Sequence, residues 1–174
     1  IIVCNFQWES CRLLANQGDG FFEDRTFLSG LGEPTYATLT FGTDFFDYDN
    51  DGFLDLFIAN GHVDPNIGII DKGGPDYAQH DQLFHNNGDK TFDDLSEQAG
   101  LEHNRPKVGR GSATGDYDND GDLDLFVSNN NHRPMLLRND GGNGNNWLSI
   151  RTVGETSNRD GIGALITVHA DGFV

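Results

Sequence analysis

Two short acidic segments carry the residues of this chain that are best suited to chemistry. Residues 47–55 and 116–124 each follow the pattern D-x-D-x-D-G-x-x-D, and the second copy begins 69 positions after the first. Calcium prefers six to eight oxygen ligands at about 2.3–2.6 Å, and alternate residues of a tight turn point to its inside. The glycine at position six lets the backbone turn sharply. The pattern therefore predicts one calcium ion in each loop, about two ions in all.

The expected ligands are the four aspartates of each loop and the backbone carbonyl at position seven. They are Asp47, Asp49, Asp51, Asp55 and the carbonyl of Phe53 in the first loop, and Asp116, Asp118, Asp120, Asp124 and the carbonyl of Asp122 in the second. Phe53 favours a backbone ligand at this position because its side chain cannot coordinate a metal. A donor set made only of oxygen disfavours zinc and copper, and magnesium tends to keep its water.

The alternative interpretation is that Asp, Asn and Gly simply mark turns. Four carboxylates in one small loop repel each other without a cation, so two copies at matching spacing favour a metal site. An EF-hand would need a Glu at position twelve and flanking helices. Ile58 and Val127 stand at that position, and the residues around them alternate as strands do. The pattern therefore indicates strand–loop–strand sites.

The internal repeat extends beyond the acidic loops. Residues 16–24 match 86–94, and Gly42-Thr43 matches Gly111-Ser112. One unit reads as four strands, at 39–45 or 109–114, at 54–59 or 123–128, at 82–85, 135–138 or 12–15, and around Phe92 or Phe22. Units of this size predict an all-β fold, a partial β-propeller of four-stranded antiparallel blades with calcium loops.

The repeat also predicts the domain organisation. Residues 1–142 hold the end of one blade and about two further blades, whereas a propeller ring needs at least about four. Remaining blades or other chains are therefore expected to close the ring. After the polar, glycine-rich segment 140–146, residues 147–153 and 162–168 are predicted strands. They indicate the start of a second β module, cut short, over 143–174.

Composition limits the partners. The 174 residues include 11 Lys plus Arg against 28 Asp plus Glu, a formal net charge of −17. Such acidity excludes nucleic acid and disfavours anionic membrane surfaces. No run of about 18 apolar residues predicts a membrane span. Calcium loops of this kind suit the high calcium outside the cytosol, which indicates a secreted, cell-surface or periplasmic protein.

Several other residues leave two interpretations open. Cys4 and Cys11 form a disulfide in an oxidising compartment or remain two free thiols. Trp8 and Trp147 stack on carbohydrate or pack against strands, and Arg110 reads as a surface residue beside the second loop. The insertion 61–81 builds a binding surface, adds metal ligands or is a solvated loop. It contains six polar residues of interest, namely His62, Asp64, Asp71, Asp76, His80 and Asp81.

These residues resemble a known family. The units Gly-Thr/Ser-x-x-x-Asp-Tyr-Asp-Asn-Asp-Gly, followed by Leu-Asp-Leu-Phe, resemble FG-GAP/VCBS-type repeats, the calcium-loop blades of integrin-α-like β-propellers. Residues 139–148 and 158–164 look like the opening of an ASPIC/UnbV module. The pairing resembles mostly bacterial extracytoplasmic proteins related to the cartilage acidic protein. The resemblance implies a secreted or surface protein with calcium-stabilised blades, and it brings no catalytic residues.

The leading functional hypothesis is an interaction or adhesion module without catalysis of its own, binding a protein or a glycan. One alternative is a structural subunit of a larger surface or redox assembly. Another is the propeller part of a secreted enzyme, for which His62, His80, Asp81 and His85 are the candidates. The sequence contains no Gly-x-Ser-x-Gly, no His-Glu-x-x-His, no phosphate loop and no Cys-x-x-Cys-His. These absences favour the non-enzymatic hypothesis.

Overall fold

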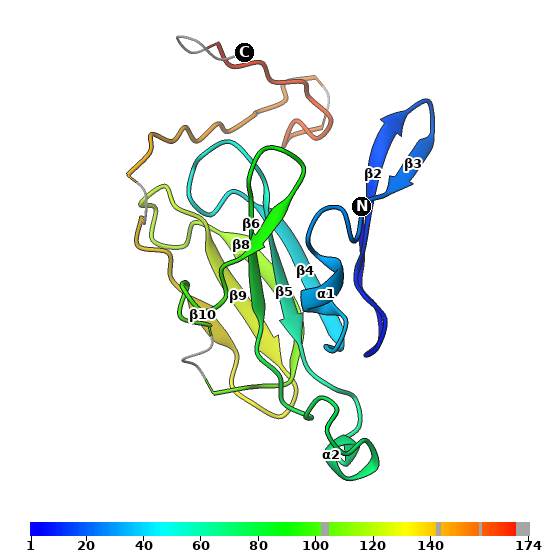
Figure 1. Cartoon of the computed structure of the whole chain (residues 1–174). Helices are drawn as coiled ribbons and strands as arrows, with labels where there is room; N and C mark the ends of the chain where they lie inside the picture. Colours follow the sequence, from blue (N-terminus) through cyan, green and yellow to red (C-terminus); the bar gives the residue numbers. More distant parts are fainter. Residues whose placement is uncertain (102–104, 142–143, 157, 170–174) are drawn as a thin grey trace.

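The computed structural model describes residues 1–101, 105–141, 144–156 and 158–169, and it is an all-β protein of three antiparallel sheets (Figure 1). The first sheet contains β1 (Ile2–Val3), β2 (Arg12–Gly18) and β3 (Phe21–Asp24). The central sheet contains β4 (Thr40–Phe46), β5 (Asp55–Asn60), β6 (Gln82–Asn86) and β7 (Phe92–Asp94). The third contains β8 (Gly109–Gly115), β9 (Asp124–Asn129) and β10 (Met135–Leu137). Two one-turn helices, α1 (Gly32–Thr35) and α2 (Ile67–Ile70), lie in the connections.

Each sheet is a meander in which strands that follow one another in the chain pair side by side. Nine of the ten strands, all except β1, lie where the repeat predicts them, so the all-β expectation is confirmed. The repeats share even an irregularity, because the register shifts between Thr40 and Gly42 in β4 and between Gly109 and Gly111 in β8. A shared β-bulge indicates that the two units fold by the same local rules.

The core lies between the sheets and is built from the two faces of β5. Leu56 and Ile58 face the first sheet, and Phe57 and Ala59 face the third. Successive side chains of a strand point to opposite faces. Because both faces of β5 are covered, all four side chains are fully buried. Full burial of one such large side chain contributes about 1.5–3 kcal/mol. The central sheet is therefore stabilised from both sides.

The third sheet is covered on one face only. Phe126 is 46% exposed, although its repeat equivalent Phe57 is 0% exposed, and Leu136 is 51% exposed where Leu83 is 6% exposed. The three described sheets stack in series and do not close into a barrel. The same residue type is thus buried in one unit and exposed in the next because only the central sheet has a neighbour on each side.

A seam of glycines lets the central and third sheets approach to backbone contact. A Cβ on Gly42 would lie 2.6 Å from the backbone nitrogen of Ser112, and one on Gly61 would lie 2.6 Å from the Cα of Val108. A Cβ on Gly109 would lie 2.8 Å from the carbonyl oxygen of Asn60. Real Cβ atoms do not approach other atoms this closely, so residues at these positions must be glycine.

The insertion 61–81 contacts both the central and the third sheet. The side chain of Gln79 accepts a hydrogen bond from the Leu39 N–H at 3.0 Å, and Gln79 also forms a β-bridge with Lys107. The hydroxyl of Tyr77 accepts one from the Asn130 side chain at 3.1 Å. These contacts join the insertion to the starts of the central and third sheets, so it is not a free solvated loop.

Arg110 is a half-buried clamp, which corrects its prediction as a surface residue. Its guanidinium donates to the carbonyl oxygens of Gly61 and His62, both at 2.9 Å, and lies 4.2 Å from the ring centroid of Phe41. The side chain therefore ties the insertion to β4 and β8. The sequence could not show this role because the two carbonyls come from residues distant in the chain.

The two strands predicted near the C-terminal end do not form. Residues 147–153 and 162–168 contain no strand, and the backbone hydrogen bonds of this segment close only local turns, such as the Ala164 N–H to Gly161 carbonyl bond of 2.9 Å. A strand needs a partner along its length, and no described segment pairs with either one. Leu165 is accordingly 94% exposed. The expected boundary between residues 142 and 143 lies outside the described residues.

Neither of the short helices found in the described chain has the length and apolar character that crossing a bilayer demands.

Candidate metal centres

The two acidic loops occupy equivalent places, one joining β4 to β5 and the other joining β8 to β9 (Figure 1). Both turn through left-handed backbone conformations. Asn50 has φ 56° and Gly52 has φ 92° in the first loop, and Asn119 has φ 64° and Gly121 has φ 97° in the second. Asn and Gly tolerate this region better than other residues. The choice of these residues therefore sets the path of each loop.

The aspartates at positions one and five fix the turn by hydrogen bonds to the backbone. Asp47 accepts from the N–H groups of Asp51 and Gly52 at 3.0 and 2.9 Å, and Asp51 accepts from the Phe53 N–H at 2.8 Å. In the second loop the same three bonds, to Asp116 and Asp120, measure 3.1, 3.1 and 3.0 Å. Two separate sequences thus form the same cradle.

The aspartate at position nine anchors the cradle to the sheet. Asp55 is fully buried and accepts hydrogen bonds from the backbone N–H groups of Tyr48 and Asn86, at 3.0 and 2.8 Å. Asp124 is buried in the same way and accepts from the N–H groups of Tyr117 and Asn139, also at 3.0 and 2.8 Å. Position nine therefore links each loop to the strand or turn that follows.

The predicted ligands gather in part. Carboxylate oxygens of Asp47, Asp49 and Asp55 lie within 4.8 Å of one another, as do those of Asp116, Asp118 and Asp124. Asp51 belongs to another group of the same size, with Asp49 and His85. Asp120 joins no such group among the described residues, and its carboxylate accepts the Asp122 N–H instead.

Position seven directs its side chain away from the cradle in both loops, which is compatible with a backbone ligand there. The ring of Phe53 lies against Gly88, where an added Cβ would come within 2.7 Å of it. The carboxylate of Asp122 accepts a hydrogen bond from the Asn50 side chain at 2.6 Å. This bond joins the second loop directly to the first.

Burial disfavours the ionised form of two carboxylates of the first loop when no cation is bound. Burial raises the pKa of Asp55 to about 6, although the N–H groups of Asn86 and Tyr48 lower it in part. Burial, followed by the charge of Asp51, also raises the pKa of Asp49. One carboxylate oxygen of Asp49 is buried and has no hydrogen-bond partner within the described part of the chain. An oxygen-rich cradle with an orphaned buried oxygen fits a hard cation such as calcium.

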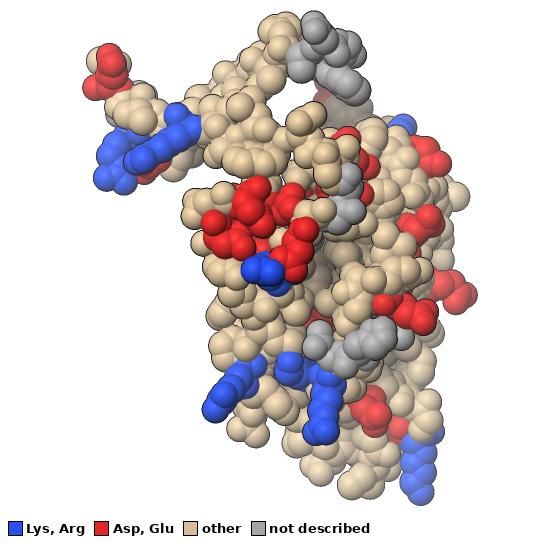
Figure 2. Space-filling model, turned by 90° about the vertical axis from the view of Figure 1, so that its left-hand side faces the viewer, with Lys and Arg blue, Asp and Glu red and all other residues tan. Residues whose placement is uncertain are grey.

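The surroundings of the loops are acidic. In the space-filling view, acidic side chains gather beneath the C-terminal segment (Figure 2). A cavity of about 420 Å³ is lined by both loops and by residues 146–149. Trp147 lies over Gly121, where an added Cβ would fall 1.9 Å from its ring. The C-terminal segment therefore packs onto the second loop.

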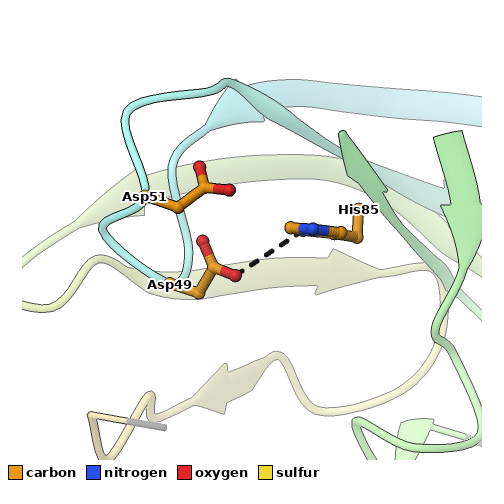
Figure 3. Close-up of side chains that lie close together, drawn as sticks. All are labelled: Asp49, Asp51 and His85. Carbon is orange, nitrogen blue, oxygen red and sulfur yellow. Dashed lines mark ion pairs between the residues drawn. The ribbon is translucent and has the colours of Figure 1, made fainter. Parts of the chain in front are cut away.

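Each loop also has a basic neighbour that was not predicted to belong to it, although His85 was a candidate enzymatic residue. His85 extends from β6 toward Asp49 and Asp51 of the first loop (Figure 3). Its Nδ1 lies 3.6 Å from Asp49 and 3.1 Å from Asp55. Arg138 follows β10, lies 3.9 Å from Asp118 and also pairs with Asp140. The signal was present, because residues 82–85 align with 135–138 in the repeat and so place His85 and Arg138 at equivalent positions.

The candidate enzymatic residues do not form one site. His85 belongs to the first acidic loop, as described above. His62 is buried, and its Nδ1 accepts the Asp64 N–H at 2.9 Å. Asp81 is buried and accepts the Asn60 N–H at 2.9 Å. Among the described residues, no metal-binding group includes His62, His80, Asp81 or another member of the insertion.

Residues 59–127 match the model of the FG-GAP-like repeat family. The matched segment begins in β5, includes the insertion and the whole second acidic loop, and ends in β9. Residues 59–127 are thus similar to an FG-GAP-like repeat, and the first loop, 69 positions before the second, has the same geometry. No curated protein matches the chain.

Proposed function

We propose that this chain is a calcium-binding β-propeller module that works outside the cytosol and binds a protein or glycan partner without catalysis of its own. The observation that carries the proposal is the agreement between the two loops. Their turn conformations agree, and equivalent hydrogen bonds differ by at most 0.2 Å. Turns that served only to reverse the chain would not need four aspartates each.

Calcium would act here as a structural ion. The proposed ligands are the ten groups expected from the sequence, with Asp47, Asp49 and Asp55 already gathered in the first loop and Asp116, Asp118 and Asp124 in the second. Repeats of this family often bind calcium. Two ions would add four positive charges to the net charge of −17, leaving −13. The ions would remove the repulsion within each loop and hold neighbouring strands together.

The proposed binding surface is the loop-bearing end of the sheets. FG-GAP-like repeats typically mediate protein interactions. Phe53 and Tyr117, one in each loop, are about half exposed, and exposed aromatic side chains are enriched at interfaces. Because these residues belong to the loops, a calcium ion that orders a loop would also order this surface.

The test is calcium binding by titration calorimetry, together with the melting temperature in calcium, magnesium or excess chelator. We expect two calcium ions per chain, and a melting temperature that falls by more than 10 °C on chelation, since each ion stabilises only the folded state. Asp49→Asn and Asp118→Asn should each remove one ion. Asp93→Asn, an exposed carboxylate on β7, is the matched control. A melting curve unchanged by chelator would sink the proposal.

The exposed face of the third sheet favours a second candidate, a structural subunit of a larger assembly. Phe126 and Leu136 are exposed where their equivalents Phe57 and Leu83 are buried against a neighbouring sheet. Light scattering in calcium separates the candidates, because a binding module stays monomeric without its partner and an assembly subunit does not.

A further inference from the structure

The two cysteines lie directly opposite each other on neighbouring strands. The strand register pairs Ile2 with Leu13 and Val3 with Arg12, so the next pair in the same register is Cys4 with Cys11. The pair three steps before the cysteines, Ile1 and Leu14, exchanges both backbone hydrogen bonds, at 2.8 and 3.0 Å. Hydrogen-bonded and non-hydrogen-bonded pairs alternate along an antiparallel ladder. Cys4 and Cys11 therefore occupy a non-hydrogen-bonded position.

This position suits a covalent bond between the sulfurs. Residues of a non-hydrogen-bonded pair have Cα atoms about 4.5 Å apart, and disulfides span Cα separations of about 4.4–6.8 Å. Both thiols also face the start of β4. The Cys11 sulfur lies 3.2 Å from the Thr40 hydroxyl, and the Cys4 sulfur lies 3.5 Å from the Phe41 carbonyl oxygen. The two side chains thus point to the same side of the ladder.

We propose that Cys4 and Cys11 are a disulfide site, at which a cross-strand bond joins the two strands of the β1–β2 ladder on the side that faces β4. Both residues are free thiols in the structure. The oxidant belongs to the class of disulfide donors, a small disulfide such as oxidised glutathione or a disulfide-carrying oxidoreductase. The site rests on strand geometry and is independent of the calcium loops.

The reaction is two successive thiol–disulfide exchanges. The Cys4 thiolate attacks one sulfur of the donor, which breaks the donor's sulfur–sulfur bond, releases one thiolate and leaves a mixed disulfide on Cys4. Cys11 then loses its proton to solvent and attacks the Cys4 sulfur, which releases the second half of the donor. Two protein thiols are oxidised by two electrons, and one donor disulfide is reduced to two thiols.

The environments of the two thiols agree with this order. Cys4 is half-buried and Cys11 is fully buried, so an external donor reaches Cys4 first. A hydrogen bond from the Cys11 thiol lowers the pKa of Cys4 to about 6. The same contact, together with burial, raises the pKa of Cys11. Cys4 therefore supplies the thiolate that attacks, and Cys11 resolves the mixed disulfide.

The bond would close a loop that carries an exposed aromatic side chain. Residues 5–10 lie between the two cysteines, and Trp8 among them has a left-handed φ of 67°. Trp8 and Tyr36 make an edge-to-face contact, with ring centroids 5.6 Å apart, at a cavity of about 330 Å³. Outside this loop, the Cys11 N–H donates to the Thr35 hydroxyl at 3.0 Å. Closing the loop would restrict Trp8 to the position that lines this cavity.

The test is a thiol count on the purified chain after incubation with oxidised glutathione. We expect no alkylation of either cysteine in denaturant, no glutathione adduct, and a mass lower by two hydrogen atoms. The melting temperature of the oxidised chain should exceed that of the dithiothreitol-reduced chain by about 5 °C, because closing a short loop restricts the unfolded state.

Cys4→Ser is the variant of choice, since Cys11 lies in the core and its replacement threatens folding. In Cys4→Ser the melting temperature should be the same with glutathione and with dithiothreitol, and Cys11 should stay alkylatable after unfolding. Two free thiols, a lasting glutathione adduct on Cys4 or a disulfide between two chains would each overturn the proposal. Repeating the count in excess chelator separates this result from the fate of the calcium loops.

Discussion

The first and second acidic loops have the same backbone but different neighbours. Asn50 and Gly52 adopt the same left-handed turn as Asn119 and Gly121. The first loop belongs to a sheet covered on both faces and is paired with a histidine, whereas the second belongs to a sheet with one open face and is paired with an arginine. The path of a loop is therefore set by its own sequence, and its charge balance and rigidity are set by the residues around it.

The largest expected effect is the loss of stability when the buried aspartate at position nine of each loop is removed, and it should differ between the two loops. Asp55→Ala would leave the N–H groups of Tyr48 and Asn86 without their acceptor inside the central sheet, at a cost of about 3 kcal/mol in the free energy of unfolding. Asp124→Ala should cost less, about 2 kcal/mol, because the third sheet has an open face. Urea unfolding in calcium measures both.

Asp93→Ala is the control for those two variants, because this exposed carboxylate lies outside both loops. It should change the free energy of unfolding little. Equal losses for Asp55→Ala and Asp124→Ala would show that burial of the sheet does not distinguish the loops.

Asp81 offers a further comparison with the loop aspartates, because it is a buried carboxylate that lies outside both acidic loops. Burial raises the pKa of Asp81 from 3.8 to about 6. The stability contributed by its protonated form is complete below about pH 4 and is lost as the pH rises through about 6. Asp81→Asn keeps an acceptor for the Asn60 N–H, and because asparagine does not ionise, this variant does not lose stability as the pH rises. Its stability relative to the parent chain should rise by about 2 kcal/mol between pH 4 and pH 7.

Unfolding curves at several pH values, with and without calcium, check this prediction. Calcium should leave the difference between Asp81→Asn and the parent chain unchanged, because Asp81 belongs to no metal-binding group in the described residues. A difference that is flat across this pH window would contradict the assigned burial effect.

The smallest expected effect concerns the basic neighbours. Arginine keeps its charge at all ordinary pH values. Arg138→Gln should therefore raise the calcium affinity of the second loop severalfold at every pH, by removing a cation that competes for Asp118. His85→Gln is the matched variant at the first loop, and it should change the affinity of that loop less, because only the arginine variant removes a fixed positive charge. Calorimetry measures both affinities, and equal changes for the two variants would remove the distinction.

The sequence predicted what depends on local spacing. The positions of Asp and Gly in each loop dictate a turn, and the repeat aligns the strands on either side of it. These features need only residues that are close in the chain, or a comparison of one unit with the next.

What the sequence missed depends on contacts between distant segments. Arg110 reads as a surface residue until the insertion brings the carbonyls of Gly61 and His62 to it. Residues 147–153 and 162–168 have the composition of strands, but a strand forms only beside a partner, and the composition of a segment does not report one. His85 and Arg138 are an intermediate case. The repeat alignment places them at equivalent positions, but it does not show that each lies beside an acidic loop.

The glycines between the central and third sheets set the angle at which the two sheets pack. Where Gly42 meets the backbone of Ser112, the separation is smaller than one methyl group would allow. A single added carbon at this point would work as a wedge and tilt one sheet away from the other. In a stack of similar sheets such a tilt would be added to every later one, so the curvature of the whole depends on an atom that is missing from one side chain.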